Sequence, residues 1–139
     1  EARAREIFQP YPDEIRRALD LREAEGRPSL LVSVHSFTPV FLQNARPWHA
    51  GVLYGPDARL ARPVLQALRA EGDLVVGDNE PYSARDPYEY TLTAHAQPRA
   101  LPHCSLEVRQ DLIAETDDAR AWGRRLAPAI GAAVASALS

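Results

Sequence analysis

Short apolar segments that alternate with helical patterns restrict the fold of this 139-residue chain more than any other feature. The apolar segments have the length and the β-branched content of strands, and the segments between them place apolar residues three or four positions apart. The sequence predicts strands over 29–35, 50–54, 73–78 and 103–111, and helices over 1–25, 57–72, 91–97 and 115–138. Strands separated by helices predict an α/β fold with a mostly parallel or mixed sheet flanked by helices.

Proline, glycine and aspartate mark the expected helix ends. Pro10 and Pro12 interrupt the first helical pattern, which resumes from about residue 13. Asp57 is the expected N-cap of the second helix and Gly72 its expected C-terminal stop.

Size and charge narrow the classes of protein to consider. The length is that of one domain with a hydrophobic core. A net charge of −3 gives no electrostatic reason to bind nucleic acid or an anionic membrane. The single cysteine, Cys104, excludes an internal disulfide and a cysteine-based zinc cluster, so a cytoplasmic protein is expected. The chain has no methionine and begins with Glu1, so we expect it to be part of a longer protein.

Polar side chains follow three of the predicted strands at the point where each apolar run ends. In an open α/β sheet, ligands bind beyond the carboxyl ends of the strands. If the strands are parallel, these side chains should therefore gather at one edge of the sheet. They are His35 and Ser36 after the first strand, Asp78, Asn79 and Glu80 after the third, and Arg109 and Asp111 after the fourth.

His35 and Glu107 each allow a structural and a functional interpretation. His35 ends an apolar strand, where it is either a hydrogen-bonded core residue or an imidazole ligand for zinc. Glu107 lies between Leu106 and Val108, and on an alternating strand it shares a face with Ser105 and Arg109. It is either a salt-bridged or solvated residue of an edge strand, or a general base in a cleft.

The remaining candidates are weaker. His49 and His103 are expected at the surface, whereas His95 either lies in a helix away from the site or faces the cleft. Cys104 fits a small buried apolar residue better than a nucleophile. The segment "GDNEPYS" has one glycine and no basic partner, so it is not a phosphate-binding loop.

Spacing alone gives no complete metal motif, because the chain has no HExxH, HxxE or HxH sequence, and catalytic zinc needs three protein ligands. Five segments in order nevertheless resemble the N-formylglutamate amidohydrolase family. They are "LVSVHSFTPVF", "RPWHAGVLYG", "VGDNEPYS", "YTLTAHA" and "LPHCSLEVRQDLI". The resemblance extends from about Ile7 to Ile130.

The resemblance implies a zinc-dependent hydrolase related to the zinc carboxypeptidase fold. Such enzymes would cleave N-formyl-L-glutamate, a small molecule, to glutamate and formate in histidine degradation. Carried over to this sequence, His35 in "VHSF" becomes a zinc ligand and Glu107 in "LEVR" the general base. The expected substrate contacts are Arg46, Asn79, Tyr82, His95 and Arg109, with Glu80 and Tyr90 ranked behind them.

The sequence departs from the family pattern at its start. Family members carry a further N-terminal portion with a "DHA"-type motif that supplies the other metal ligands, and no such motif occurs here. Residues 1–139 are therefore expected to be the C-terminal part of a single α/β domain, which alone binds zinc poorly and has little activity. Two alternatives stay open: a hydrolase of other N-acyl amino acids, and a non-catalytic α/β binding module. The sequence does not fix the oligomeric state.

Overall fold

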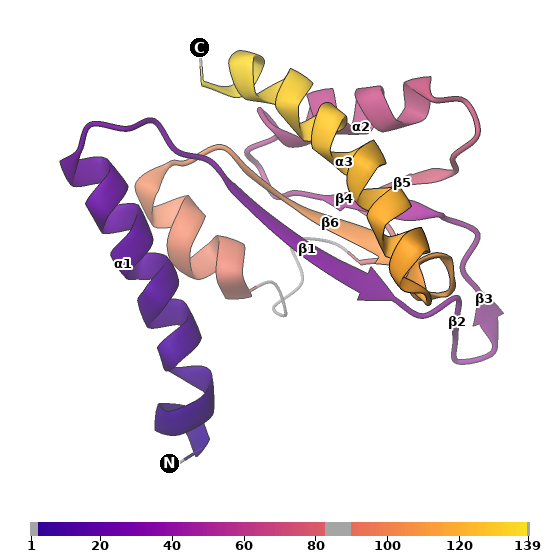
Figure 1. The fold of residues 1–139 in the computed structure, drawn as a ribbon, viewed down its shortest axis with the longest axis horizontal. Coiled ribbons are helices and arrows are strands. Elements are labelled where there is room, and N and C mark those ends of the chain that lie inside the picture. Colours follow the sequence, from indigo (N-terminus) through magenta and orange to yellow (C-terminus); the bar gives the residue numbers. More distant parts are fainter. Residues whose placement is uncertain (1–2, 83–89, 139) are drawn as a thin grey trace.

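The computed structural model describes residues 3–82 and 90–138, and Figure 1 shows the arrangement of their helices and strands. The strands are β1 (Leu31–Phe37), β2 (Val40–Phe41), β3 (Asn44–Ala45), β4 (Ala50–Leu53), β5 (Val76–Asp78) and β6 (His103–Arg109). The α-helices are α1 (Pro10–Ala24), α2 (Ala61–Ala70) and α3 (Thr116–Ala137). Short π or 3₁₀ turns complete the list: η1 (Ala4–Phe8), η2 (Leu92–Ala96), η3 (Gln97–Arg99) and η4 (Gln110–Ile113).

Four strands form one mixed sheet in the order β1-β6-β4-β5, which confirms the predicted fold class. β1 pairs with β6 and β4 pairs with β5 in parallel, whereas β4 and β6 are antiparallel. The carboxyl ends of β1 and β6 therefore lie at the same end of the sheet, and the carboxyl end of β5 lies at the opposite end. The expectation that Asp78 and Asn79 lie at the same end of the sheet as His35 is wrong, because β5 runs antiparallel to β1.

One face of the sheet carries the larger apolar core, which α2 and α3 cover (Figure 1). The sheet contributes Val52, Leu106 and Val108, which alternate with residues of the opposite face. The helices contribute apolar residues at helical spacing, among them Val64, Leu65, Leu68, Trp122, Leu126, Ala129 and Ala133. Among the described residues, no helix is long and apolar enough to cross a membrane.

The opposite face of the sheet is covered less completely. The η2 turn packs against β1 and β6, with Leu92 and Ala96 buried, and α1 packs against η2. The outer side of α1 and the preceding turn leaves large apolar side chains in solvent, including Ile7, Phe8, Tyr11 and Leu21. Ser105 and Glu107, the residues of β6 that alternate with its core residues, point to this less covered face.

Several element boundaries differ from the sequence prediction. α1 includes Pro10 and Pro12, because a proline in the first turn of a helix removes no hydrogen bond. The N-cap position of α2 is Leu60, not Asp57, whose carboxylate accepts a hydrogen bond from the backbone of Arg59 before the helix starts. The hairpin of β2 and β3 was not predicted, because its two-residue turn consists of Leu42 and Gln43 rather than the usual Asn-Gly.

Candidate active site

His35 and Glu107 lie side by side on the less covered face of the sheet. They are register partners on the parallel strands β1 and β6. Partners on adjacent strands are about 4.8 Å apart in backbone position and point to the same face. The Glu107 side chain is buried, with 6% of its surface exposed, whereas His35 is exposed. The two residues singled out from the sequence thus lie next to each other on one face of the sheet.

Glu107 belongs to the interior of the sheet. Strand β6 lies between β1 and β4, and Gly51 of β4 is the register partner of Glu107 on the other side. The edge-strand interpretation of Glu107 is therefore wrong. A buried carboxylate in a central strand is costly unless function or bonding retains it.

Two glycines continue the row of Glu107 across the sheet and make room for a loop. Gly51 pairs with Gly77 of β5, and the segment after β5 folds back over both residues. A Cβ at Gly51 would lie 1.9 Å from the carbonyl oxygen of Glu80, and a Cβ at Gly77 would lie 2.7 Å from the Cβ of Glu80. Glycine inside a strand often marks such a close approach. The glycines in "AGVL" and "VGD" are the sequence signal for this contact, which was not predicted and which places Glu80 over the face that carries Glu107.

Asn79 shapes this returning loop. Its backbone has a φ of 55°, a left-handed conformation that asparagine tolerates better than most residues. Its side-chain oxygen accepts a hydrogen bond from the backbone of Tyr54 at 2.8 Å, and its own N–H donates to Val52 at 3.0 Å. Asn79 thus fastens the loop to the end of β4, which is a structural use of a residue predicted to contact substrate.

Arg46 and Tyr82 come together beside the end of β1. The guanidinium carbon of Arg46 lies 4.8 Å from the ring centroids of both Phe41 and Tyr82, and 5.8 Å from that of Phe37. Nη1 of Arg46 donates to the Tyr82 hydroxyl at 3.0 Å. The aromatic residues Phe37 and Phe41 were not predicted as part of the site. The arginine in "RPWH" gave no indication of which rings would surround it.

Arg109 holds the loop that carries Arg46. Its Nη1 donates to the backbone carbonyl oxygens of Arg46 at 3.3 Å and of Trp48 at 3.4 Å. Its Nε and Nη2 donate to the two carboxylate oxygens of Asp111 at 2.8 and 3.2 Å. This charged partner lowers the pKa of Asp111.

The four histidines occupy very different environments. His95 is buried in η2 with 2% of its surface exposed, and its ring lies nearly perpendicular to that of Tyr90 at a centroid distance of 6.3 Å. Burial lowers the pKa of His95, and the nearby cations Arg16 and Arg99 add to the effect. His49, expected at the surface, is half-buried and accepts a hydrogen bond from the backbone of Val75.

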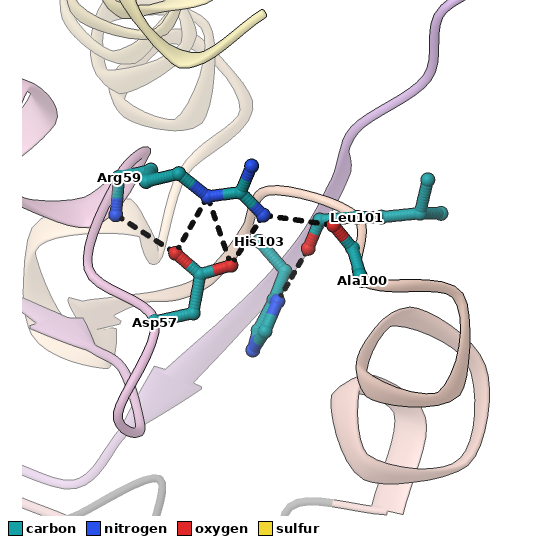
Figure 2. A network of polar contacts seen from close by, with 5 residues as sticks. All are labelled: Asp57, Arg59, Ala100, Leu101 and His103. Carbon is teal, nitrogen blue, oxygen red and sulfur yellow. Dashed lines mark hydrogen bonds and ion pairs between the residues drawn. The ribbon is translucent and has the colours of Figure 1, made fainter.

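His103, also expected at the surface, is instead buried at the start of β6. Figure 2 shows its Nδ1 beside the carbonyl oxygen of Leu101, at 2.7 Å, so this nitrogen carries the proton. In the same network Arg59 binds the carboxylate of Asp57 and donates to the carbonyl of Ala100 at 2.8 Å. These contacts fix the turn that leads into β6, and they make His103 a structural residue.

The described residues offer neither a reactive thiol nor a complete metal site. Cys104 is fully buried, and burial raises its pKa to about 12, so the thiol is not poised as a nucleophile. Within residues 3–82 and 90–138, no three histidine, cysteine, aspartate or glutamate side chains are grouped so that they could hold a metal ion. His35 and Glu107 alone do not make a zinc site, because catalytic zinc needs three protein ligands.

The comparisons with known proteins agree with the resemblance seen in the sequence. The model of the N-formylglutamate amidohydrolase family matches residues 1–114, whereas no curated protein matches the chain. The crystal structure of gene product Atu2144 from Agrobacterium tumefaciens is 36% identical in sequence, with a TM-score of 0.90. The match covers 97% of this chain and 53% of the other, so the chain spans about half the length of that relative. The chain belongs to the N-formylglutamate amidohydrolase family.

Proposed function

We propose that this chain carries the general base of an amide hydrolase that releases formate from N-formyl-L-glutamate. The observation that carries the proposal is the pairing of buried Glu107 with exposed His35 on one face of the sheet. Membership of the amidohydrolase family supports a hydrolytic reaction on a small molecule.

Glu107 has the chemistry and the position of a general base. In the proposed reaction water attacks the formyl carbon, the C–N bond breaks, and formate and glutamate leave. Glu107 takes a proton from the attacking water and passes it to the departing nitrogen. Burial in a central strand holds the carboxylate in one orientation, which general-base catalysis requires.

Zinc is the metal that we propose for the intact site, with His35 as one ligand. The described residues do not supply a set of three ligands, so the others must come from elsewhere in the protein. When bound, zinc polarises an amide carbonyl and lowers the pKa of water. The exposure of His35 leaves its ring accessible for this role.

The test is formate release from N-formyl-L-glutamate by the longest product of the gene that encodes this chain. Glu107→Gln keeps the size of the side chain but removes the base, so turnover should fall by roughly 10²–10⁴-fold. Glu115→Gln is the matched control, because Glu115 is exposed before α3, and its turnover should equal that of the parent protein.

Each outcome tests a different part of the proposal: the general base, the substrate or the enzymatic activity. Turnover of Glu107→Gln within tenfold of the parent would show that Glu107 is not the base. Hydrolysis of other N-acyl amino acids without formate release would keep the base and change the substrate. A parent protein that hydrolyses none of these amides would favour a non-catalytic binding module.

A further inference from the structure

Arg46 is a buried cation that lacks a carboxylate partner in the described part of the chain. Its side chain is 8% exposed, yet none of the ion pairs within residues 3–82 and 90–138 includes it. Burying an unpaired charge lowers stability, and proteins seldom retain one without a use. The rings of Phe37, Phe41 and Tyr82 offset part of this cost through cation–π contacts.

The side-chain hydrogen bonds of Arg46 among the described residues all use one nitrogen. Nη1 donates to the Tyr82 hydroxyl at 3.0 Å and lies 3.3 and 3.4 Å from the hydroxyl and carbonyl oxygens of Thr38. Nε and Nη2 form the edge of the guanidinium that binds carboxylates in a bidentate manner. Neither atom has a hydrogen-bond acceptor among the described residues. Some side-chain atoms of the described residues are fully buried and have no hydrogen-bond partner, but Nε and Nη2 of Arg46 are not among them. This edge of the guanidinium therefore keeps contact with solvent.

Two other arginines show what the same edge does when an acid is nearby. Nε and Nη2 of Arg109 bind the carboxylate of Asp111, and those of Arg59 bind Asp57. Arg109 is therefore already engaged, and its remaining donor supports the backbone of Arg46. Of the two arginines among the expected substrate contacts, Arg46 has the available edge.

The position of Arg46 suits a substrate bound at His35 and Glu107. Its guanidinium carbon is 5.8 Å from the ring of Phe37, and Phe37 follows His35 by two residues on β1. Two residues along a strand span about 7 Å and return to the same face. A carboxylate held by Arg46 would thus lie within one small-molecule length of His35.

We propose that the Nε and Nη2 edge of Arg46 binds a carboxylate group of the substrate, and that Phe37, Phe41 and Tyr82 hold the guanidinium in place. The identity of the substrate rests on the function proposed above, but binding of a carboxylate does not. Arg46 is thereby the residue that selects acyl amino acids over uncharged amides.

The experiment measures binding of glutarate, a dicarboxylate that cannot be hydrolysed, by calorimetric titration and by the melting temperature of this chain. Arg46→Lys keeps the charge but loses the planar edge, so its dissociation constant for glutarate should rise about tenfold or more. Arg46→Met removes the buried charge, and it should melt no lower than wild type and gain nothing from glutarate.

Arg125→Met is the matched control. Arg125 also lies against an aromatic ring, that of Trp122 at 5.8 Å, but Asp73 and Glu71 neutralise it. Its glutarate binding should equal that of wild type. Retained glutarate binding in a parent protein that hydrolyses no N-formyl-L-glutamate would support Arg46 and refute the proposed function.

Three results would overturn the assignment. The first is equal glutarate affinity in wild type and Arg46→Lys. The second is a melting temperature that rises as much with chloride as with glutarate at matched ionic strength. The third is a lower melting temperature for Arg46→Met than for wild type, together with no rise in the melting temperature of wild type on addition of glutarate. Arg46 would then be a purely structural residue.

Discussion

His95 and Ser105 break the rule that buried polar groups are hydrogen-bonded. Neither ring nitrogen of His95 nor the hydroxyl of Ser105 meets a partner in the described part of the chain. Ser105 lies two residues before Glu107 on the same face of β6, and η2, which carries His95, packs against that strand. Each such group costs about 1–3 kcal/mol, so side chains of this kind concentrate where a fold gives up stability for function.

The buried imidazole of His95 should make the fold sensitive to acid. Burial and the nearby cations lower its pKa below the ordinary value of 6.5, so the folded state binds fewer protons than the unfolded state. Stability is therefore complete above pH 6.5 and is lost as the pH falls from 6.5 through the lowered pKa of the folded protein. His95→Gln, which does not titrate, should flatten this loss.

Urea unfolding between pH 7.5 and pH 5 measures the effect. The control is His35→Gln, because His35 is exposed, and its stability should fall with acid as in wild type. An equal acid loss in wild type and His95→Gln would show that His95 is not responsible.

Among the elements, the row of glycines across β4 and β5 decides whether the loop at Glu80 can lie over the sheet. Gly51→Ala would place a Cβ 1.9 Å from the backbone oxygen of Glu80, so the loop must move. We expect the free energy of unfolding to fall by about 1–3 kcal/mol, the range for overpacking.

Chemical denaturation of the variants tests this expectation. Gly131→Ala is the control, because an added Cβ there meets no atom within 4 Å and the residue lies inside α3. Its stability should rise by about 0.5–1 kcal/mol, the helical advantage of alanine over glycine. If Gly51→Ala is as stable as wild type, the loop does not depend on the glycine row.

The predictable part of this fold was the set of elements. Apolar periodicity located the four strands of the sheet, and the closing helix over 115–138 matches α3 within a residue at each end. The direction of each strand was not predictable, because no local sequence pattern shows whether the next strand after Asp78 runs parallel or antiparallel to its neighbours. The antiparallel pairing of β4 with β6 follows from packing of the whole sheet.

The candidate site was predictable to the same extent. An imidazole at the end of an apolar run and a glutamate inside one were visible as local anomalies, and the resemblance supplied their roles, although β1 continues past His35 to Phe37. Their adjacency depends on a register between β1 and β6, which lie far apart in sequence. The rings around Arg46 come from three separate segments, the strand end at Phe37, the hairpin at Phe41 and the loop at Tyr82, so no sequence window contains them.

The molecule as a whole leaves its edge strand β1 only partly covered in the part of the chain that the structure describes. β1 is an edge strand of the sheet, His35 on the candidate face is exposed, and Val34 on the opposite face is 60% exposed. Long exposed edges and apolar patches usually mark surfaces that another segment covers. Since the chain spans about half of the Atu2144 gene product, we propose that residues corresponding to the other half complete the domain and its metal site.

Zinc binding by this chain alone tests that proposal. With one exposed histidine beside one carboxylate and no group of three ligands among the described residues, the isolated chain should lose zinc during gel filtration. The longest product of the gene should keep about one zinc per chain, as expected for a catalytic site with three protein ligands. His35→Ala should abolish zinc retention in that longer protein, and His49→Ala should not, because the ring of His49 bonds the backbone of Val75. Metal analysis after gel filtration measures all four samples, and an isolated chain that retains one zinc would place the complete ligand set within these 139 residues.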